Sequence, residues 1–401
     1  MPAVATAWTL PALIERAQAA HPELEQSVRE VEASQGRAVQ AGLYPNPVLG
    51  TASPQMAGSI SQYNVFTSQE FVTAHKLTLA QTAAFREVEQ YRFRYQAARL
   101  RIVAAVRREF YTMLVLQRRL VLQQELAAIV MRSRDTARLL LEGGEGTKAD
   151  VLLLDIDYDR ALMAVRNLQT ELEVSRRRLA LAVGIPELPI GQVNGNLNVV
   201  IPSTNLESLR IYVAATHPEM GVARLETGRS QFLLRRAEVQ PIPNVNLMSG
   251  YQRQLNQPDQ NQALFQAVIE VPIWNRNQGN IRAAQAHVAR AVAGVRTAEL
   301  DLGQRVAQAY NDFTVATQRV EVYEKQLRPK AQETFQIARE LYEQGLGHID
   351  FFRLFQSQRT LIDTELGFLD VLEARLLAAS DLAALSQWSD FPDGPPPMPK
   401  P

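Results

Sequence analysis

The sequence lacks the features of several common classes of protein. It has no cysteine among its 401 residues, which excludes disulfides, thiolate metal sites, cysteine nucleophiles and a lipidated N-terminal cysteine. It has no excess of charge, because 42 Lys and Arg balance 42 Asp and Glu, and this disfavours nucleic acid as a partner. It also has no apolar run near the roughly twenty residues of a membrane helix. Packing alone must therefore hold the fold, and helical membrane spans are excluded.

Motifs for catalysis and for cofactors are also missing. The five histidines, at positions 21, 75, 217, 287 and 348, never reach a metal-ligand spacing such as HExxH. The run GGEG at 143–146 lacks the Lys-Ser/Thr of a phosphate-binding loop, and no nucleophile elbow is present. We therefore expect no enzymatic activity, no cofactor and no metal site.

The sequence does contain an internal repeat. The tetrapeptide HPEL at 21–24 recurs as HPEM at 217–220, and PNP at 45–47 aligns with PIP at 241–243 at the same offset. A stretch rich in Pro, Gly and Asn separates the two halves, as a loop should. We predict a first structural repeat at 8–184, a connector at 185–204, a second repeat at 205–388 and a disordered tail at 389–401.

Each repeat is predicted to contain a medium helix, a β-hairpin, a very long helix, a tight glycine turn and a returning helix. In the second repeat, apolar residues from Ile281 onward follow a heptad spacing with one extra four-residue step. The counterpart at about 78–142 contains no proline, and each helix would be on the order of 100 Å long. Pro329 is expected to kink the second long helix without ending it. An ordinary soluble coiled coil would also explain these helices.

The predicted strands separate these possibilities. In the second repeat, the segment 263–273 places its apolar residues on one face and Gln266 and Glu270 on the other, and its partner at 243–254 alternates similarly. The first repeat has poorer strands at 48–53 and 63–71. Strands of about ten residues with one apolar side suit a membrane β-barrel. Four strands cannot close a barrel, and an open edge in lipid leaves backbone groups unpaired. At least two copies of the chain must therefore share one barrel, and three copies would supply twelve strands.

These features resemble the TolC-like outer membrane efflux family. The order of the elements, the HPEL-like helix starts and the YPNP at 44–47 carry the resemblance, and PIWNRNQG at 272–279 is most similar to its CzcC-like cation-efflux branch. The resemblance covers about residues 8–388. It implies a mainly α fold with duplicated long coiled-coil helices and two β-hairpins. It further implies a homotrimer with an α-helical tunnel and a 12-stranded membrane β-barrel.

The resemblance also implies a function and a location. The protein would be a passive exit duct of a tripartite efflux system of the resistance-nodulation-division (RND) type, with heavy-metal cations as a candidate cargo. Its partners would be a periplasmic adaptor (membrane fusion) protein, an inner-membrane efflux pump and the lipid of a Gram-negative outer membrane, with the helices in the periplasm. The small residues Ala3, Ala5 and Ala7 resemble the end of a signal peptide, and the rest of that signal is expected to be missing from the sequence.

Other interpretations stay open. The same architecture can serve as the outer membrane duct of a type I secretion system. A coiled-coil scaffold with no channel is a second alternative. A periplasmic adaptor is less well supported, because the lipoyl-like β domains that would flank its helical hairpin are missing from the sequence.

The strand-to-helix junction of the second repeat supplies the first group of candidate residues: Pro272, Trp274, Asn275, Asn277 and Gly279. By the resemblance, the strand leaves the membrane here and becomes tunnel wall. Trp274 would then be an interfacial anchor, and the alternative is that it only packs at a strand end. Gly279 is expected to let the backbone bend, and Asn275 or Asn277 to cap the helix.

Acidic residues near the two turns supply a candidate periplasmic gate. Asp150 fits a capping box with Thr147, which is a sufficient structural explanation for it, but Asp155 and Asp157 follow closely. In a symmetric oligomer such carboxylates would form a cation-attracting ring, whereas a solvated outer face is the alternative. In the second repeat Asp350 is followed by two phenylalanines. This departs from the acidic pair that the resemblance implies and allows a hydrophobic constriction.

Both turns would, by the resemblance, meet the helical hairpin of the adaptor. The candidate docking residues are Gly144, Gly146, Thr147, Tyr342, Gly345 and Gly347.

Overall fold

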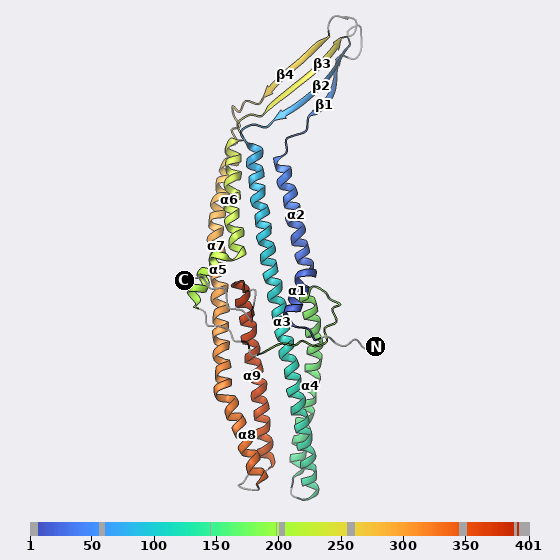
Figure 1. The fold of residues 1–401 in the computed structure, drawn as a ribbon, viewed down its shortest axis with the longest axis vertical. Helices are drawn as coiled ribbons and strands as arrows, with labels where there is room; N and C mark the ends of the chain where they lie inside the picture. The colour runs from blue at the N-terminus through green and yellow to red at the C-terminus, as the bar shows by residue number, and fades with distance from the viewer. Residues whose placement is uncertain are drawn as a thin grey trace. The chain divides into compact units, whose positions relative to one another are not determined.

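The computed structural model describes residues 7–55, 61–144, 146–197, 199, 205–254, 261–344, 351–388 and 391–392. The fold is mainly α-helical with one small sheet, as predicted. Its elements follow in the order α1 (Leu10–Ala20), α2 (Pro22–Gly42), β1 (Val48–Gln55), β2 (Gln62–Phe71), α3 (Lys76–Glu142), α4 (Lys148–Val183), α5 (Leu206–Thr216), α6 (Pro218–Val239), β3 (Val245–Gln254), β4 (Gln262–Ile269), α7 (Gln278–Val322), a π-helical turn (Tyr323–Leu327), α8 (Arg328–Glu343) and α9 (Phe351–Leu385) (Figure 1).

The chain forms two compact units, and both halves of the sequence contribute to each. The helical unit consists of Met1–Glu25, Ala98–His217 and Asp301–Pro401, and the sheet unit consists of Gln26–Ala97 and Pro218–Leu300. The long helices α3 and α7 each have residues in both units. None of the helices in the described ranges combines the length and apolar character needed to cross a membrane.

The two hairpins join into one antiparallel sheet with strand order β1-β2-β3-β4. The central pairing runs in register along all of β2, from Gln62 opposite Gln254 to Phe71 opposite Val245. β4 ends at Ile269, so the prediction that this strand continues to residue 273 was wrong. The reason lies at Pro272, which has no N–H for a ladder, and at Ile273, whose N–H turns back to the carbonyl of Val271 at 2.9 Å.

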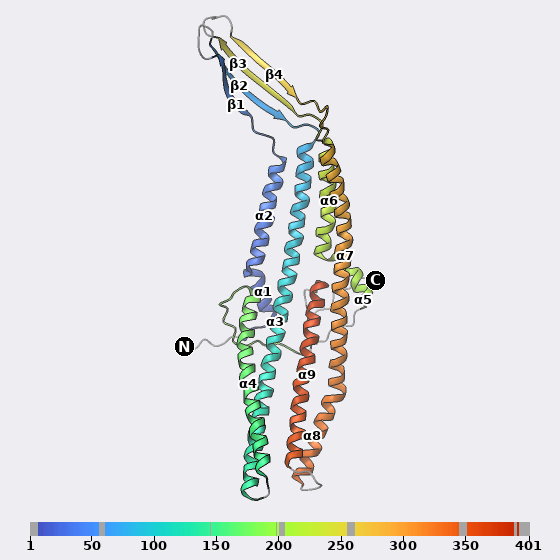
Figure 2. The same cartoon turned by 180° about the vertical axis from the view of Figure 1, so that it is seen from behind.

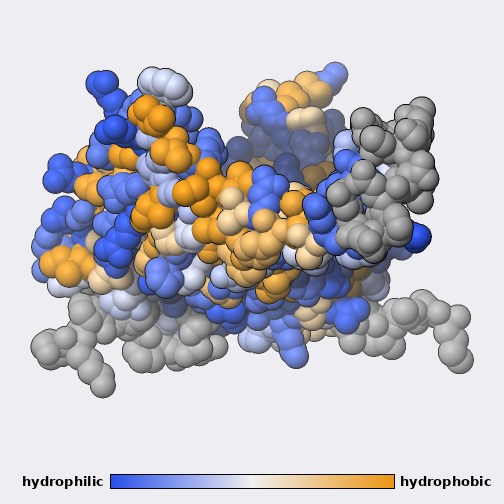
Figure 3. Space-filling model, turned by 90° about the horizontal axis from the view of Figure 1, so that it is seen from above, coloured by the Kyte–Doolittle hydropathy of each residue, from blue (hydrophilic) through white to orange (hydrophobic). Residues whose placement is uncertain are grey.

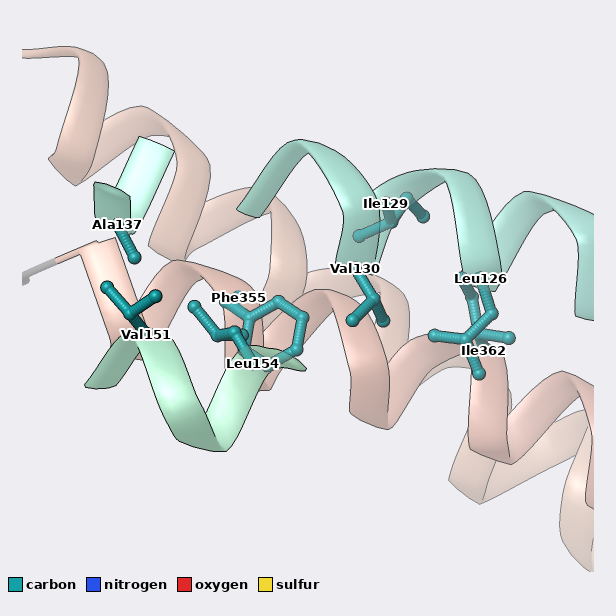
Figure 4. Packing of buried hydrophobic residues seen from close by; sticks show 8 residues of the cluster. All are labelled: Leu126, Ile129, Val130, Ala137, Val151, Leu154, Phe355 and Ile362. Atoms are coloured by element: carbon teal, nitrogen blue, oxygen red, sulfur yellow. The ribbon is translucent and has the colours of Figure 1, made fainter. Parts of the chain in front are cut away.

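The helical unit contains two helical hairpins, α3 with α4 and α8 with α9. Their connected ends lie at the same end of this unit in both views (Figures 1 and 2). Near these ends α3, α4 and α9 share a core, drawn in Figure 4, in which the apolar stripes of the three helices meet. The buried residues of this core are Leu126, Ile129, Val130, Ala137, Val151, Leu154, Phe355 and Ile362.

The second long helix is interrupted where the sequence predicts. The π-helical turn Tyr323–Leu327 leads directly into α8, and Pro329 lies in the first turn of α8. A proline cannot donate the helical hydrogen bond of its position, and a π turn is one way to absorb that loss. The helix therefore continues past Pro329 without ending, as expected. Leu327, which the heptad pattern places in the buried seam, is 41% exposed.

A histidine precedes the equivalent helices α2 and α6 of the two repeats. The imidazole Nδ1 of His21 accepts a hydrogen bond from the N–H of Glu23 at 3.2 Å, ahead of α2. His217 stands at the corresponding place ahead of α6 and is buried.

At the other end of the chain, Phe391 is buried against Tyr111 and Trp388. The packed chain thus extends past residue 388, where we expected the tail to begin.

Candidate functional sites

The sheet has one face that is largely apolar and exposed. Residues paired across antiparallel strands point to the same side, so the registers assign each residue to a face. The apolar face carries Leu49, Tyr63, Val65, Phe71, Val245, Leu247, Tyr251, Ala263, Phe265, Ala267 and Ile269. Phe265 is 74% exposed and Leu49 78%. Seen from above, exposed hydrophobic side chains lie among hydrophilic ones on this side of the molecule (Figure 3). Such a face needs an apolar environment.

The opposite face is mainly polar. It carries Asn64, Ser68, Glu70, Asn246, Gln252, Gln262 and Gln266 beside the apolar Val48, Ala52, Phe66, Met248, Leu264 and Val268. Ser68 donates to the side chain of Asn246 across the strands at 2.6 Å. A sheet with one apolar and one hydrogen-bonding face fits a wall between lipid and water.

Aromatic side chains lie at both ends of the apolar face. Tyr63 and Tyr251 lie toward the hairpin loops, while Tyr44, Phe71 and Trp274 lie where the strands join the helices. All five are between 46% and 86% exposed. Aromatic residues favour both interfaces of a membrane. The sequence analysis singled out only Trp274, because the strand register is what places Tyr63, Tyr251 and Phe71 at the two ends of this face.

The edges of the sheet are open. Within the described residues β1 pairs only with β2, and β4 pairs only with β3. Every residue of β4 is exposed. Unpaired edge groups are a template for another strand, so a second copy of the sheet could continue the ladder.

The junction from β2 to α3 is fastened by a buried lysine that the sequence analysis missed. Lys76 is only 5% exposed. Its amine donates to the carbonyl of Ile242 and, at 2.7 Å, to the side chain of Asn244. Asn244 in turn donates to Glu70 at 2.7 Å. Burial lowers the pKa of Lys76, and the carboxylate of Glu70 opposes that shift. A positive charge at the start of a helix is unfavourable because of the helix dipole. Lys76 at the start of α3 was therefore the one sign in the sequence that this side chain has a specific partner.

The junction from β4 to α7 contains the predicted group of residues. Asn277 adopts φ 59°, and its carbonyl accepts the first helical hydrogen bond, from Ile281 at 2.9 Å. The bend is therefore at Asn277 and not at Gly279, which has no positive φ; asparagine tolerates this left-handed region better than most residues. Asn275 accepts from the N–H of Asn277 at 3.1 Å. Trp274 is 86% exposed.

The two junctions line a common cavity in the sheet unit. Its volume is about 680 Å³, and Glu70, Lys76, Asn244, Pro272, Asn275 and Asn277 are among its lining residues. Asn277 also donates to the carbonyl of Ala237 in α6 at 2.8 Å. The junction residues predicted from sequence are thus brought together with the lysine that was not predicted.

The end of the α3–α4 hairpin matches the predicted cap. Thr147 accepts from the N–H of Asp150 at 3.3 Å, and Asp150 accepts from the N–H of Thr147 at 3.1 Å. This is the reciprocal pairing of a capping box. Gly144 has φ 79°, and a side chain at Gly146 would approach the backbone of Leu141 to 3.0 Å. The turn therefore requires glycine at both places.

The other candidate acidic residues are held in ion pairs. Asp155 accepts from Arg138 at 2.8 Å, and Arg134 lies 3.9 Å from it. Asp157 accepts from Arg359 of α9 at 2.8 Å. The carboxylates that we expected to form a ring are thus partly neutralised within one chain. Of the candidate residues of the second turn, Tyr342 is 41% exposed, while Gly345, Gly347 and Asp350 lie outside the described residues.

No group of three or more His, Asp or Glu side chains in the described part of the chain is placed to hold a metal ion.

Comparisons with known proteins agree with this geometry. Residues 213–386 match the model of the outer membrane efflux protein family. The chain is 23% identical to the cobalt-zinc-cadmium resistance protein CzcC of Cupriavidus metallidurans over 93% of this chain and 88% of that protein. The crystal structure of CusC is similar with a TM-score of 0.78 at 18% identity, covering 94% of this chain and 91% of CusC. The crystal structure of the outer membrane protein VceC of Vibrio cholerae is similar with a TM-score of 0.76 at 17% identity. The match covers 94% of this chain and 95% of VceC.

The long helical hairpins and the four-stranded sheet have the fold of the TolC-like outer membrane channels. Its second half matches the outer membrane efflux protein family, and the chain is similar to CzcC over nearly its whole length. Members of this family are channel proteins and not enzymes. The resemblance to this family and the fold expected from the sequence are therefore confirmed.

Proposed function

We propose that three copies of this chain form an exit duct across the outer membrane, as the last part of an RND-type tripartite efflux system. The observation that carries the proposal is the open-edged sheet with one apolar and one polar face. Three such sheets would close a twelve-stranded barrel, which removes the open edges. The helices of the same chains would form the tunnel in the periplasm. An adaptor and an inner-membrane pump complete the path, and the pump supplies the energy for conduction that is passive in the duct.

We propose heavy-metal cations as the cargo. The support is the likeness to CzcC, a protein named for resistance to cobalt, zinc and cadmium. Growth of a deletion strain on graded zinc, cobalt and cadmium tests this, and an unchanged tolerance to all three would contradict it. The duct of a type I secretion system is the alternative, and loss of a secreted protein from the medium of the same strain would favour it.

The hairpin ends of the helical unit would serve as the periplasmic gate and the adaptor-docking surface. The proposal of a gate is supported by two ion pairs that join α4 to its neighbours. Asp155 pairs with Arg138 of α3, and Asp157 pairs with Arg359 of α9. The exposed Tyr342 and the capped turn around Gly144, Gly146 and Thr147 support docking. Docking is tested by cross-linking the adaptor to a photoreactive residue at position 342, with position 211 on α5 as the control, and equal labelling at both would contradict it.

The mass of the purified protein in detergent and its conductance in a planar bilayer test the duct itself. A trimer that conducts in small steps and prefers cations is the expected result. A detergent-independent species without conductance would overturn the proposal and favour the scaffold.

A further inference from the structure

The helical unit contains a cavity that belongs to none of the sites described above. Its volume is about 510 Å³, which is within the range of ligand sites, about 300–1,000 Å³. Four separate segments of the unit line it: the start of α1, the middle of α3, the connector at 194–196 and the last described residues of the chain, 391–392. The two ends of the described chain thus meet at one cavity.

The lining is mainly apolar and aromatic, with a few polar groups. Phe110 is 1% exposed, Tyr111 2% and Phe391 4%. Tyr111 lies edge to face with both other rings, at centroid distances of 5.5 Å to Phe110 and 6.4 Å to Phe391. Polar groups come from the side-chain amides of Gln18 and Asn194 and from the carboxylate of Glu15.

This lining favours one kind of ligand. Among the described lining residues Glu15 is the one that carries a charge, so a ligand with a positive charge is favoured. Apolar walls with amide N–H groups suit a segment that is apolar and rich in hydrogen-bond acceptors. A proline-rich segment meets both conditions, because proline has no N–H and the polyproline II helix leaves its carbonyl groups free. Aromatic-lined grooves are a recurring place for such segments.

The chain itself continues from the cavity with such a segment. Pro392 lines the cavity, and the sequence goes on as DGPPPMPKP to residue 401. Five of these nine residues are proline, and Lys400 supplies a positive charge. At about 3.1 Å per residue in a polyproline II helix, the eight residues from Pro392 to Lys400 reach about 25 Å. The segment is therefore long enough to cross the cavity from Pro392 to Glu15.

A buried donor beside the cavity also lacks an acceptor. Trp388 is 6% exposed, and its indole N–H has no hydrogen-bond partner in the described part of the chain. Its ring packs on Phe391 of the cavity wall, with 5.1 Å between the centroids. A buried tryptophan N–H usually has a partner, and leaving it unpaired is unfavourable. A carbonyl group of a segment packed here provides the missing acceptor.

We propose that residues 393–401 bind in this cavity of their own chain as a polyproline II segment, with Lys400 paired to Glu15. The segment then connects the C-terminal end of the chain to α1 and to the connector. Its own chain is favoured over another protein, because attachment at Pro392 keeps the segment at an effective concentration on the order of millimolar. The inference is independent of the proposed duct, since it needs neither a second copy nor a membrane.

The mobility of a spin label in the full-length protein tests the docking. The label is attached to Met398→Cys, which is the only thiol because the chain contains no cysteine, and the spectrum is recorded in detergent. We expect a label that is mostly immobilised. Replacing residues 395–397 by glycine in the same protein should make it mobile, because a glycine-rich chain is flexible. These substitutions lie outside the folded core, so they leave the cavity intact.

Exchange of charges tests the cavity as the docking place. Glu15→Lys and Lys400→Glu should each raise the ratio of mobile to immobilised label by up to about fivefold, as expected for an exposed ion pair. The double variant should restore the original ratio. Glu125→Lys is the matched control, because Glu125 is likewise exposed in the helical unit and does not line the cavity.

A chemical cross-link separates docking within one chain from docking on a neighbour. Glu15→Cys/Lys400→Cys is treated with a short bismaleimide and run on a denaturing gel. Monomers with both thiols consumed are the expected result, and covalent multimers overturn docking in the segment's own chain. The proposal is also overturned by a mobile label in the protein with residues 395–397 unchanged, or by charge variants that behave like Glu125→Lys. Conductance of the same samples reports on the duct separately.

Discussion

Arg359 of α9 donates a hydrogen bond of 2.8 Å to the carboxylate of Asp157 on α4. The pair connects the helical hairpin of the first repeat with that of the second, close to the ends where both turns lie. Arg160 is 3.8 Å from Asp157, and Asp363 is 3.8 Å from Arg359. Asp157 and Arg359 therefore form a link between α4 and α9, and each has one further partner within its own helix. If the hairpins must move apart for the duct to open, this pair resists that movement.

We predict that Arg359→Gln raises the open probability of the reconstituted channel roughly fivefold, because a partly exposed ion pair contributes up to about 1 kcal/mol. Single-channel recording measures this. Arg339→Gln is the matched control, since Arg339 pairs with Glu343 within its own helix, at 3.9 Å. Equal open probabilities for the wild type and Arg359→Gln would remove the pair from the gate.

The two faces of β4 offer a matched pair of substitutions. Phe265 lies on the apolar face and its neighbour Gln266 on the polar face. We predict that Phe265→Arg lowers the stability of the inserted protein by up to about 2–4 kcal/mol, and that Gln266→Arg has little effect. The folded fraction in liposomes across a urea series measures both. If the two variants unfold at the same urea concentration, the apolar face does not meet lipid.

Trp274 is predicted to lie at the lipid headgroup level. Brominated lipids quench a tryptophan in contact with them, so part of the wild-type fluorescence should be quenched in such vesicles. We expect Trp274→Phe to lose this quenchable part, while Trp8→Phe keeps it. Quenching that survives in Trp274→Phe would place the side chain away from the membrane.

The buried amine of Lys76 is predicted to hold the first junction together. Lys76→Met would remove the donor to the carbonyl of Ile242 and one of the two donors to the side chain of Asn244, which keeps the N–H of Thr73. A hydrogen bond from a charged donor contributes about 1.5–3 kcal/mol. We expect a lower thermal unfolding temperature and faster proteolysis near the junction. Lys325→Met is the control, because that side chain is 72% exposed. An unfolding temperature as high as that of the control would show that the hydrogen bonds of Lys76 contribute little.

His21 is predicted to make stability depend on pH. Burial lowers the pKa of His21 below its ordinary value of 6.5, and the unprotonated Nδ1 accepts the N–H of Glu23. The contribution is therefore present above the unfolded pKa and is lost as the pH falls through the lowered folded pKa. The loss should reach up to about 1 kcal/mol, as for other helix caps. His21→Asn keeps a cap without a titrating group, so its unfolding temperature should fall less between pH 7 and pH 5. Parallel curves would contradict this.

Periodicity along the chain determined much of the architecture. The long helix predicted at 78–142 is observed at Lys76–Glu142, and the capping box of Thr147 and Asp150 is present. These features depend on neighbours in the chain, such as helix caps, helix breakers and the spacing of apolar residues. The alternation of β3 and β4 likewise predicted the apolar face. The same logic erred at the end of β4 and at Gly279, where hydrogen bonds among the residues 271–281 decide the path.

Only the tertiary structure decided which residues from distant parts of the chain meet. Nothing local to Lys76 reveals that its amine reaches Ile242 and Asn244, because that contact depends on how the two repeats pack. The carboxylate of Asp157 was read from sequence as a candidate for an open ring, and the fold pairs it with Arg359. Local interactions fix periodicity and caps, whereas the partner of a charged side chain depends on packing between helices.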